Sequence, residues 1–116
     1  MRDLAMQVAG GLALLTAIIH GVLGETKVFA HARIEPARIR LLLRLIWQCG
    51  AIAWAGFGVL LVAAPFMGSE AARLWVIGAA VTAYGVGAIG NARVTRGRHF
   101  GWMALTAVSV LALAGA

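Results

Sequence analysis

The stretch LAMQVAGGLALLTAIIHGVLG, residues 4–24, contains no Asp, Glu, Lys or Arg in 21 consecutive positions. An α-helix rises about 1.5 Å per residue, and the hydrocarbon core of a bilayer is about 30 Å thick. A charge-free apolar run of this length is therefore predicted to cross a membrane as one helix.

Three more apolar runs follow, at residues 41–64, 72–90 and 99–115. Of the 116 residues, 62% are hydrophobic and 12% are charged, whereas about 25% of a typical soluble domain is charged. Pro65 is expected to end the second helix, and Ser69 to cap the start of the third. The sequence thus predicts an all-α polytopic membrane protein, in which residues 1–116 form a single four-transmembrane-helix bundle.

The basic residues predict the orientation of this bundle. Eight of the ten Lys and Arg residues lie in or beside two loops on one side: Lys27, Arg33, Arg38, Arg40, Arg44, Arg93, Arg96 and Arg98. The other side has only Arg2 and Arg73. Because short cytoplasmic loops collect Lys and Arg, we expect a multi-pass protein of the cell inner membrane with both termini in the periplasm. The same rule explains the net charge of +6 without a nucleic-acid partner, and it places the basic loops beside anionic lipid headgroups.

The chain contains a candidate internal repeat. Residues 16–28 align without gaps on residues 82–94, with five identities in thirteen positions, and Glu25 falls opposite Asn91. A duplication would make the bundle two parallel helical-hairpin repeats about an axis along the membrane normal. The alternative is that helices rich in Gly and Ala align through composition alone.

Polar residues gather toward the cytoplasmic ends of the predicted spans. They are His20, Glu25, Arg44, Gln48, Asn91 and His99. Ionisable groups at membrane depth usually face the bundle interior and find a partner, so these six form a candidate polar site, either a binding site or a proton path open to the cytoplasm. The alternative is that they are interfacial and bond headgroups, water and helix ends. Arg44 is the expected partner of Glu25, with His20 as the second candidate.

Small residues recur at every fourth position of the first predicted helix. They are Ala9, Ala13, Ala17 and Gly21. This spacing lines one helical face and permits close approach of another helix backbone, so we predict that the face packs against a helix and not against lipid.

Catalytic and metal-binding patterns are missing from the sequence. It has no His-x-x-His, Cys-x-x-Cys or Glu-x-x-His motif. We therefore predict no catalytic residue, no metal site and no cofactor, with haem ligation by His20 and His99 as the open alternative. Trp47 and Trp54 are seven residues apart and share a helix face, where a quinone or lipid tail could lie in place of ordinary helix packing.

The pattern His20-x-x-x-Gly24-Glu25 followed by Arg44-x-x-Trp47 resembles a family of small four-span bacterial inner-membrane proteins of unknown function. In that family a histidine often follows the tryptophan, whereas this chain has Gln48, which puts a shared metal role for that position in doubt. The resemblance covers the first two spans. It implies the four-span fold and directs attention to His20, Glu25 and Trp47, but it supplies no activity.

Three functions are compatible with the sequence. The first is a non-catalytic bundle that acts by helix packing, in a homo-oligomer or as an accessory subunit of a membrane complex. The second is a small proton-coupled transporter that works as a dimer through Glu25 and His20. The third is a haem- or quinone-binding module that uses the cytoplasmic polar residues.

Overall fold

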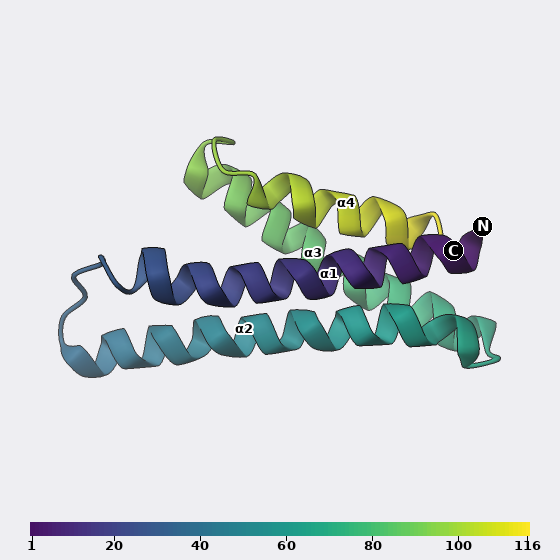
Figure 1. The fold of residues 1–116 in the computed structure, drawn as a ribbon, viewed down its shortest axis with the longest axis horizontal. Coiled ribbons are helices and arrows are strands. Elements are labelled where there is room, and N and C mark those ends of the chain that lie inside the picture. Colours follow the sequence, from purple (N-terminus) through teal and green to yellow (C-terminus); the bar gives the residue numbers. More distant parts are fainter.

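The computed structural model describes residues 1–116 and is entirely helical, as predicted (Figure 1). Its four α-helices are α1 (Arg2–Leu23), α2 (Ala37–Ala63), α3 (Glu70–Thr95) and α4 (Gly101–Leu113). A π-helical turn, η1 (Gly24–Val28), continues α1, and a 3-10 turn, η2 (Ala64–Phe66), follows α2. Three helices are long and apolar enough to cross a membrane, and α4 is a shorter apolar helix.

The helices form two hairpins, α1–α2 and α3–α4 (Figure 1). Both chain termini and the turn between α2 and α3 lie at one end of the bundle, here named the terminal end. The connections from α1 to α2 and from α3 to α4 lie at the opposite end, here named the loop end. Toward the loop end, the α3–α4 ribbon diverges from the α1–α2 ribbon in Figure 1.

Helix boundaries follow the predicted signals, with shifts of a few residues. Ser69 caps α3, because its Oγ accepts a hydrogen bond from the Ala72 N–H at 3.2 Å, and Pro65 lies in η2 directly after α2. At the loop end the helices extend beyond the predicted spans 41–64 and 72–90, since α2 begins at residue 37 and α3 continues to residue 95. An apolar run marks only the uncharged part of a helix, and both helices continue beyond it into segments that contain Arg.

The fourth helix is shorter than the predicted span 99–115: α4 covers 13 residues, and His99 precedes it by two positions. The cause lies in the turn after α3. Arg96 and Gly97 both adopt left-handed backbone angles, with φ of 52° and 72°, and the Gly97 N–H donates to the Ala92 carbonyl at 2.8 Å. This helix-ending arrangement reverses the chain before α4 can begin.

The buried core occupies the half of the bundle nearest the terminal end and the middle. Its buried members are Met6, Ala9, Ala13, Leu61, Ala64, Ile77, Ala80, Tyr84, Ala88, Leu105, Val108 and Ala112. On the predicted small-residue face, Ala9 and Ala13 are fully buried and Ala17 is 3% exposed, whereas Gly21 is partly exposed beside Gln48. Small residues let α1 and α2 approach closely, since a Cβ built on Gly10 would lie 2.6 Å from the Gly58 carbonyl oxygen.

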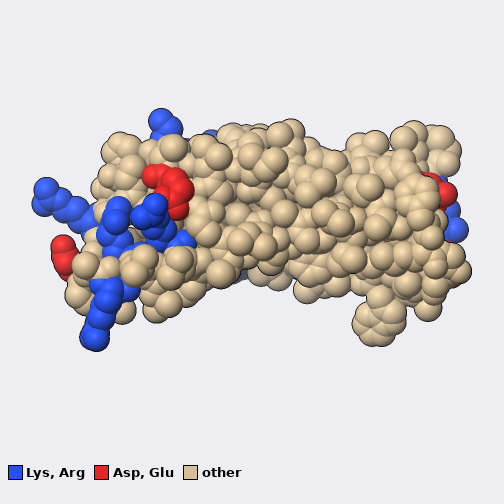
Figure 2. All heavy atoms as spheres, turned by 60° about the horizontal axis from the view of Figure 1, so that its bottom comes forward, with Lys and Arg blue, Asp and Glu red and all other residues tan.

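The sides of the bundle are apolar and uncharged. Figure 2 shows a middle zone without Lys, Arg, Asp or Glu on the face that it presents, a dense group of basic side chains at the loop end and few charges at the terminal end. Only 22–33% of the apolar window of each long helix is buried within the chain. Most of this apolar surface therefore requires a non-aqueous environment or a protein partner.

Arg73 joins three segments at the terminal end. Its side chain, 11% exposed, forms ion pairs with Asp3 and, at 3.7 Å, with Glu70. It also donates to the Gly115 carbonyl at 3.1 Å and to the Met6 sulfur at 3.4 Å. These contacts tie α1, α3 and the C-terminal residues together, so the terminal end of the bundle is closed.

Candidate functional site

A cavity of about 700 Å³ lies between the two hairpins in the half of the bundle toward the loop end. All four helices contribute to its wall, for example Ile19 from α1, Trp54 from α2, Gly90 from α3 and Leu105 from α4. At its inner limit, the Tyr84 hydroxyl is buried and donates to the Trp54 carbonyl at 2.6 Å. The cavity thus begins where the packed core ends.

His20 is held in this cavity by two tryptophans of α2. Its ring lies parallel to the Trp47 indole, with centroids 4.3 Å apart and an interplanar angle of 3°, and 4.6 Å from the Trp54 ring. Trp47 Nε1 also donates to the His20 backbone carbonyl at 2.9 Å. Neither imidazole nitrogen forms a hydrogen bond with the protein, and the side chain is part of the cavity wall. Its hydrogen-bonding capacity is therefore available to a bound molecule or to water.

The π-helical turn η1 positions the residues that follow His20. At this point, Trp47 bonds the His20 carbonyl, and Gln48 Nε2 donates to the Gly21 carbonyl at 3.1 Å. Gly24 is required for this contact, because a Cβ at that position would lie 2.2 Å from Trp47 Nε1. Side chains of α2 thus bond carbonyls of α1 where the helix widens, and such π-turns are frequent at functional sites.

Asn91 and His99 approach the cavity from the α3–α4 hairpin. Asn91 Oδ1 accepts a hydrogen bond from the Trp102 N–H at 3.0 Å, and His99 Nδ1 accepts one from the Gly101 N–H at 3.0 Å. Both side chains therefore satisfy backbone donors at the start of α4. The amide nitrogen of Asn91 and the Nε2–H of neutral His99 remain as donors beside the cavity.

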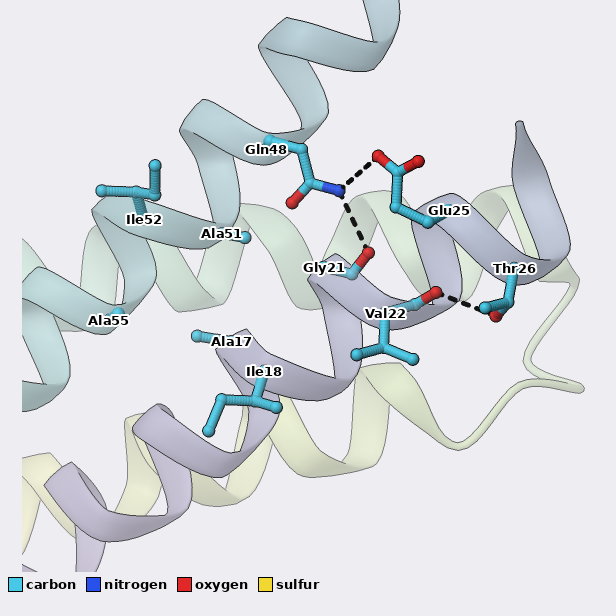
Figure 3. A pocket seen from close by; sticks show the side chains of 10 residues that line it. All are labelled: Ala17, Ile18, Gly21, Val22, Glu25, Thr26, Gln48, Ala51, Ile52 and Ala55. Carbon is cyan, nitrogen blue, oxygen red and sulfur yellow. Dashed lines mark hydrogen bonds between the residues drawn. The ribbon is translucent and has the colours of Figure 1, made fainter. Parts of the chain in front are cut away.

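Glu25 and Gln48 lie elsewhere, along a shallow groove on the outer side of α1 and α2 (Figure 3). Arg44 forms the predicted ion pair with Glu25, at 2.6 Å from Nη2 to Oε2. Gln48 Nε2 lies between Glu25 Oε1, at 2.8 Å, and the Gly21 carbonyl (Figure 3). Glu25 therefore contacts Arg44 and Gln48 and not His20, whose ring contacts the two tryptophans.

The six predicted polar residues are therefore divided between two places, which corrects the expectation of one polar site. His20, Asn91 and His99 line the cavity between the hairpins, and Glu25, Arg44 and Gln48 join α1 to α2 on its outer side. No group of three or more His, Cys, Asp or Glu side chains converges in a way that could hold a metal ion.

Comparisons of the chain with known protein families, with curated proteins and with solved structures find no match. The function must therefore be argued from the cavity itself.

Two contributors to the cavity were not predicted as site residues. Lys27 belongs to η1 and lines the cavity, with no ion pair to any acidic residue. Trp47 was indicated by the face that it shares with Trp54 and by the family resemblance, but it was not among the six candidate polar residues. It holds both the ring and the backbone of His20.

The cavity has the composition of a small-molecule site. Such sites are typically concave spaces of about 300–1,000 Å³ with mostly apolar walls and a few convergent polar groups. Here, aromatic and aliphatic side chains form much of the wall, and His20, Lys27, Asn91, His99 and two threonines supply the polar groups.

Proposed function

We propose that this chain is an integral protein of the cell inner membrane that binds a small ligand between its two hairpins. Support for membrane insertion comes from three helices of sufficient length, the uncharged sides of the bundle and the restriction of charge to its two ends. The excess of basic residues at the loop end favours a cytoplasmic position for that end and a periplasmic position for both termini.

The binding proposal rests on the surroundings of the His20 ring. An imidazole at this depth normally forms hydrogen bonds, because an unpartnered polar group in an apolar region is costly. His20 is fixed by two tryptophans and keeps both ring nitrogens free beside a 700 Å³ space. This is the arrangement expected of a ligand contact that is formed in advance of binding.

The proposed site does not use Glu25 as a titrating group. The carboxylate is bound by Arg44 and Gln48 outside the cavity, so it lacks the contact with His20 that the transporter hypothesis required. A carrier that works through the Glu25 and His20 pair is therefore less well supported than a binding protein.

Two glycines of α3 permit a direct test of the cavity. A Cβ on Gly90 meets no atom within 4 Å, and Gly90 lines the cavity, so Gly90→Leu should fill the space without displacing the fold. Gly78 also has no neighbour within 4 Å and is exposed like Gly90, but it is not part of the cavity wall, which makes Gly78→Leu the matched control. Native mass spectrometry of the purified protein should show a bound small molecule in the wild type and in Gly78→Leu, and not in Gly90→Leu. A wild type without any such adduct, or equal retention by both variants, would contradict the proposal.

The orientation is tested with single cysteines in a Cys49→Ser background. Impermeant thiol reagents applied to intact cells should label cysteines at residue 68 and at the C-terminus, and should leave one at residue 34 unlabelled. Labelling at residue 34 would place the cavity mouth on the periplasmic side.

Self-association is a second candidate function, favoured by the groove on the outer side of α1 and α2. Its floor is formed by small residues, including Ala17, Gly21, Ala51 and Ala55, which would admit a helix from another copy (Figure 3). The mass of the protein in detergent should then correspond to an oligomer, and Ala51→Leu with Ala55→Leu should convert it to a monomer. A monomeric wild type would remove this candidate.

A further inference from the structure

The hydroxyls of Thr16 and Thr95 in the cavity wall already donate to backbone carbonyls, and four other polar groups of the wall keep free donors. They are the Lys27 ammonium, the Asn91 amide nitrogen and the His99 Nε2–H, with a ring nitrogen of His20 able to donate as well. The acceptor atoms of Asn91 and His99 are already used by backbone N–H groups of α4. A ligand for this set must therefore present acceptor atoms to the loop end of the cavity.

No carboxylate of the chain compensates these donors. Asp3 and Glu70 are bound to arginines at the terminal end, Glu25 is bound to Arg44 in the outer groove, and Glu35 is not part of the cavity wall. Lys27 is exposed at the loop end, and its charge has no ion-pair partner in the chain. This electrostatic asymmetry favours an anion over a neutral molecule.

The remainder of the wall is suited to hydrocarbon. Ile19, Leu23, Trp54 and Leu105 line the cavity, and the Trp54 ring packs closely against Gly87, where a Cβ would lie 2.9 Å from it. Lys27, Asn91 and His99 all lie at or near helix ends at the loop end, whereas Trp54 and Leu105 lie closer to the packed core. The cavity thus has a polar, electropositive mouth and an apolar interior.

We propose that the cavity binds an anionic amphiphile, with its carboxylate or phosphate headgroup beside Lys27, Asn91 and His99 and its acyl chain between Trp54 and Leu105. This inference rests on the proposed ligand-binding function and names the class of ligand. A neutral ring compound such as a quinone could stack on the aromatic residues, but it would leave the Lys27 ammonium without a counter-charge. Charge-assisted hydrogen bonds to an anionic headgroup use every free donor of the mouth.

Bromine-substituted lipids test this class directly, because bromine quenches nearby tryptophan and Trp47 and Trp54 line the cavity. The protein in neutral detergent is titrated with dibromostearate, with its neutral methyl ester, and with brominated phosphatidylglycerol and phosphatidylcholine. We expect each pair of lipids to differ: an anionic lipid should quench the fluorescence saturably, and its neutral counterpart should quench it only weakly. Saturation by the fatty acid alone identifies a free acid as the source, and saturation by phosphatidylglycerol identifies a membrane lipid.

Two variants that each remove one positive charge distinguish a specific headgroup site from general electrostatic attraction of the anionic lipid to the basic loops. Lys27→Gln should weaken binding of the anionic quencher about tenfold, as expected for the loss of one charge-assisted contact. Arg96→Gln removes the same charge from an exposed residue that is not in the cavity wall and should leave the affinity unchanged. Equal weakening by both variants would overturn the proposal. Circular dichroism of both variants establishes that they are folded before titration.

The outcomes distinguish this inference from the function on which it rests. If the neutral lipids saturate the wild type as strongly as the anionic ones and Gly90→Leu abolishes that binding, the cavity binds a ligand but the ligand class proposed here is wrong. If no quencher saturates and Gly90→Leu has no effect on quenching or on bound adducts, both proposals fail.

Discussion

Arg44 Nε donates hydrogen bonds to both carboxylate oxygens of Glu25, at 2.7 and 3.0 Å, and joins α2 to the turn that ends α1. A third hydrogen bond comes from Gln48 Nε2, which donates to Oε1 at 2.8 Å. The carboxylate is therefore surrounded by donors from a single helix. Its role is to fix the loop end of the first hairpin, beside the cavity but outside it.

Glu25→Gln is expected to lower the thermal midpoint of the protein in detergent by a few degrees, because it removes the charge that orients Arg44. Arg44→Gln should cause a similar loss, and the double variant should lose less than the sum of the two, as residues in one contact do. Arg38→Gln, an exposed arginine on the same helix without an ion pair, is the control and should have little effect. Additive losses from Glu25→Gln and Arg44→Gln would show that the ion pair does not stabilise the fold.

Gly24→Ala should destabilise the protein by about 1–3 kcal/mol, the usual cost of overpacking a close contact. The added Cβ would lie 2.2 Å from Trp47 Nε1 and displace the indole from His20, so the tryptophan fluorescence should change as well. Gly90, its partner in the candidate repeat, has no neighbour within 4 Å, and Gly90→Ala should be neutral or stabilising by up to about 1 kcal/mol. Equal effects of the two substitutions on the thermal midpoint would contradict the role given to Gly24.

Ala13→Leu should lower stability by about 1–3 kcal/mol, since Ala13 is fully buried in the contact face of α1. Ala53, on the exposed surface of α2, provides the matched control, and Ala53→Leu should leave the thermal midpoint nearly unchanged. If Ala13→Leu were also tolerated, the small-residue face would not be a tight helix contact.

Arg73→Gln should cost about 2 kcal/mol, because it removes hydrogen bonds that join the N-terminal helix, α3 and the C-terminal residues. Arg2→Gln removes the same charge from a side chain that is 50% exposed, and its effect should be distinctly smaller. Chemical unfolding in mixed micelles measures both. Similar losses for the two variants would indicate that Arg73 contributes only through the net charge of the terminal end.

The axial position of each polar residue could be predicted from the sequence, but the neighbour that each helix face meets could not. A fixed rise per residue places His20, Glu25 and Arg44 near the same end of the bundle. Glu25 follows His20 by five residues, about 140° around a regular α-helix, so the two side chains lie on different faces. Of the two partners expected for Glu25, Arg44 forms the contact and His20 does not, because His20 faces the second hairpin. Nothing in residues 24–28 signals the π-helical turn that follows Leu23.

Arg73 illustrates a second limit of what could be predicted from the sequence. The sequence indicated only that it lies on the side with few basic residues. Its contacts with Asp3 and the Gly115 carbonyl depend on how the two hairpins meet, which no local pattern encodes. The Glu25–Arg44 pair was predictable because both residues lie at matching depth on consecutive helices of one hairpin.

The brevity of α4 has a consequence for the lipid around it. Its 13 residues span about 20 Å, roughly 10 Å less than an average hydrocarbon core. The end of α4 near Gly115 is tied to Arg73, so the shortfall falls at the loop end, beside His99. A bilayer responds to such a mismatch by thinning locally. Headgroups of the leaflet at the loop end would then descend to the level of His99 and Phe100, and a lipid could reach the space between the hairpins by moving sideways, without leaving the membrane.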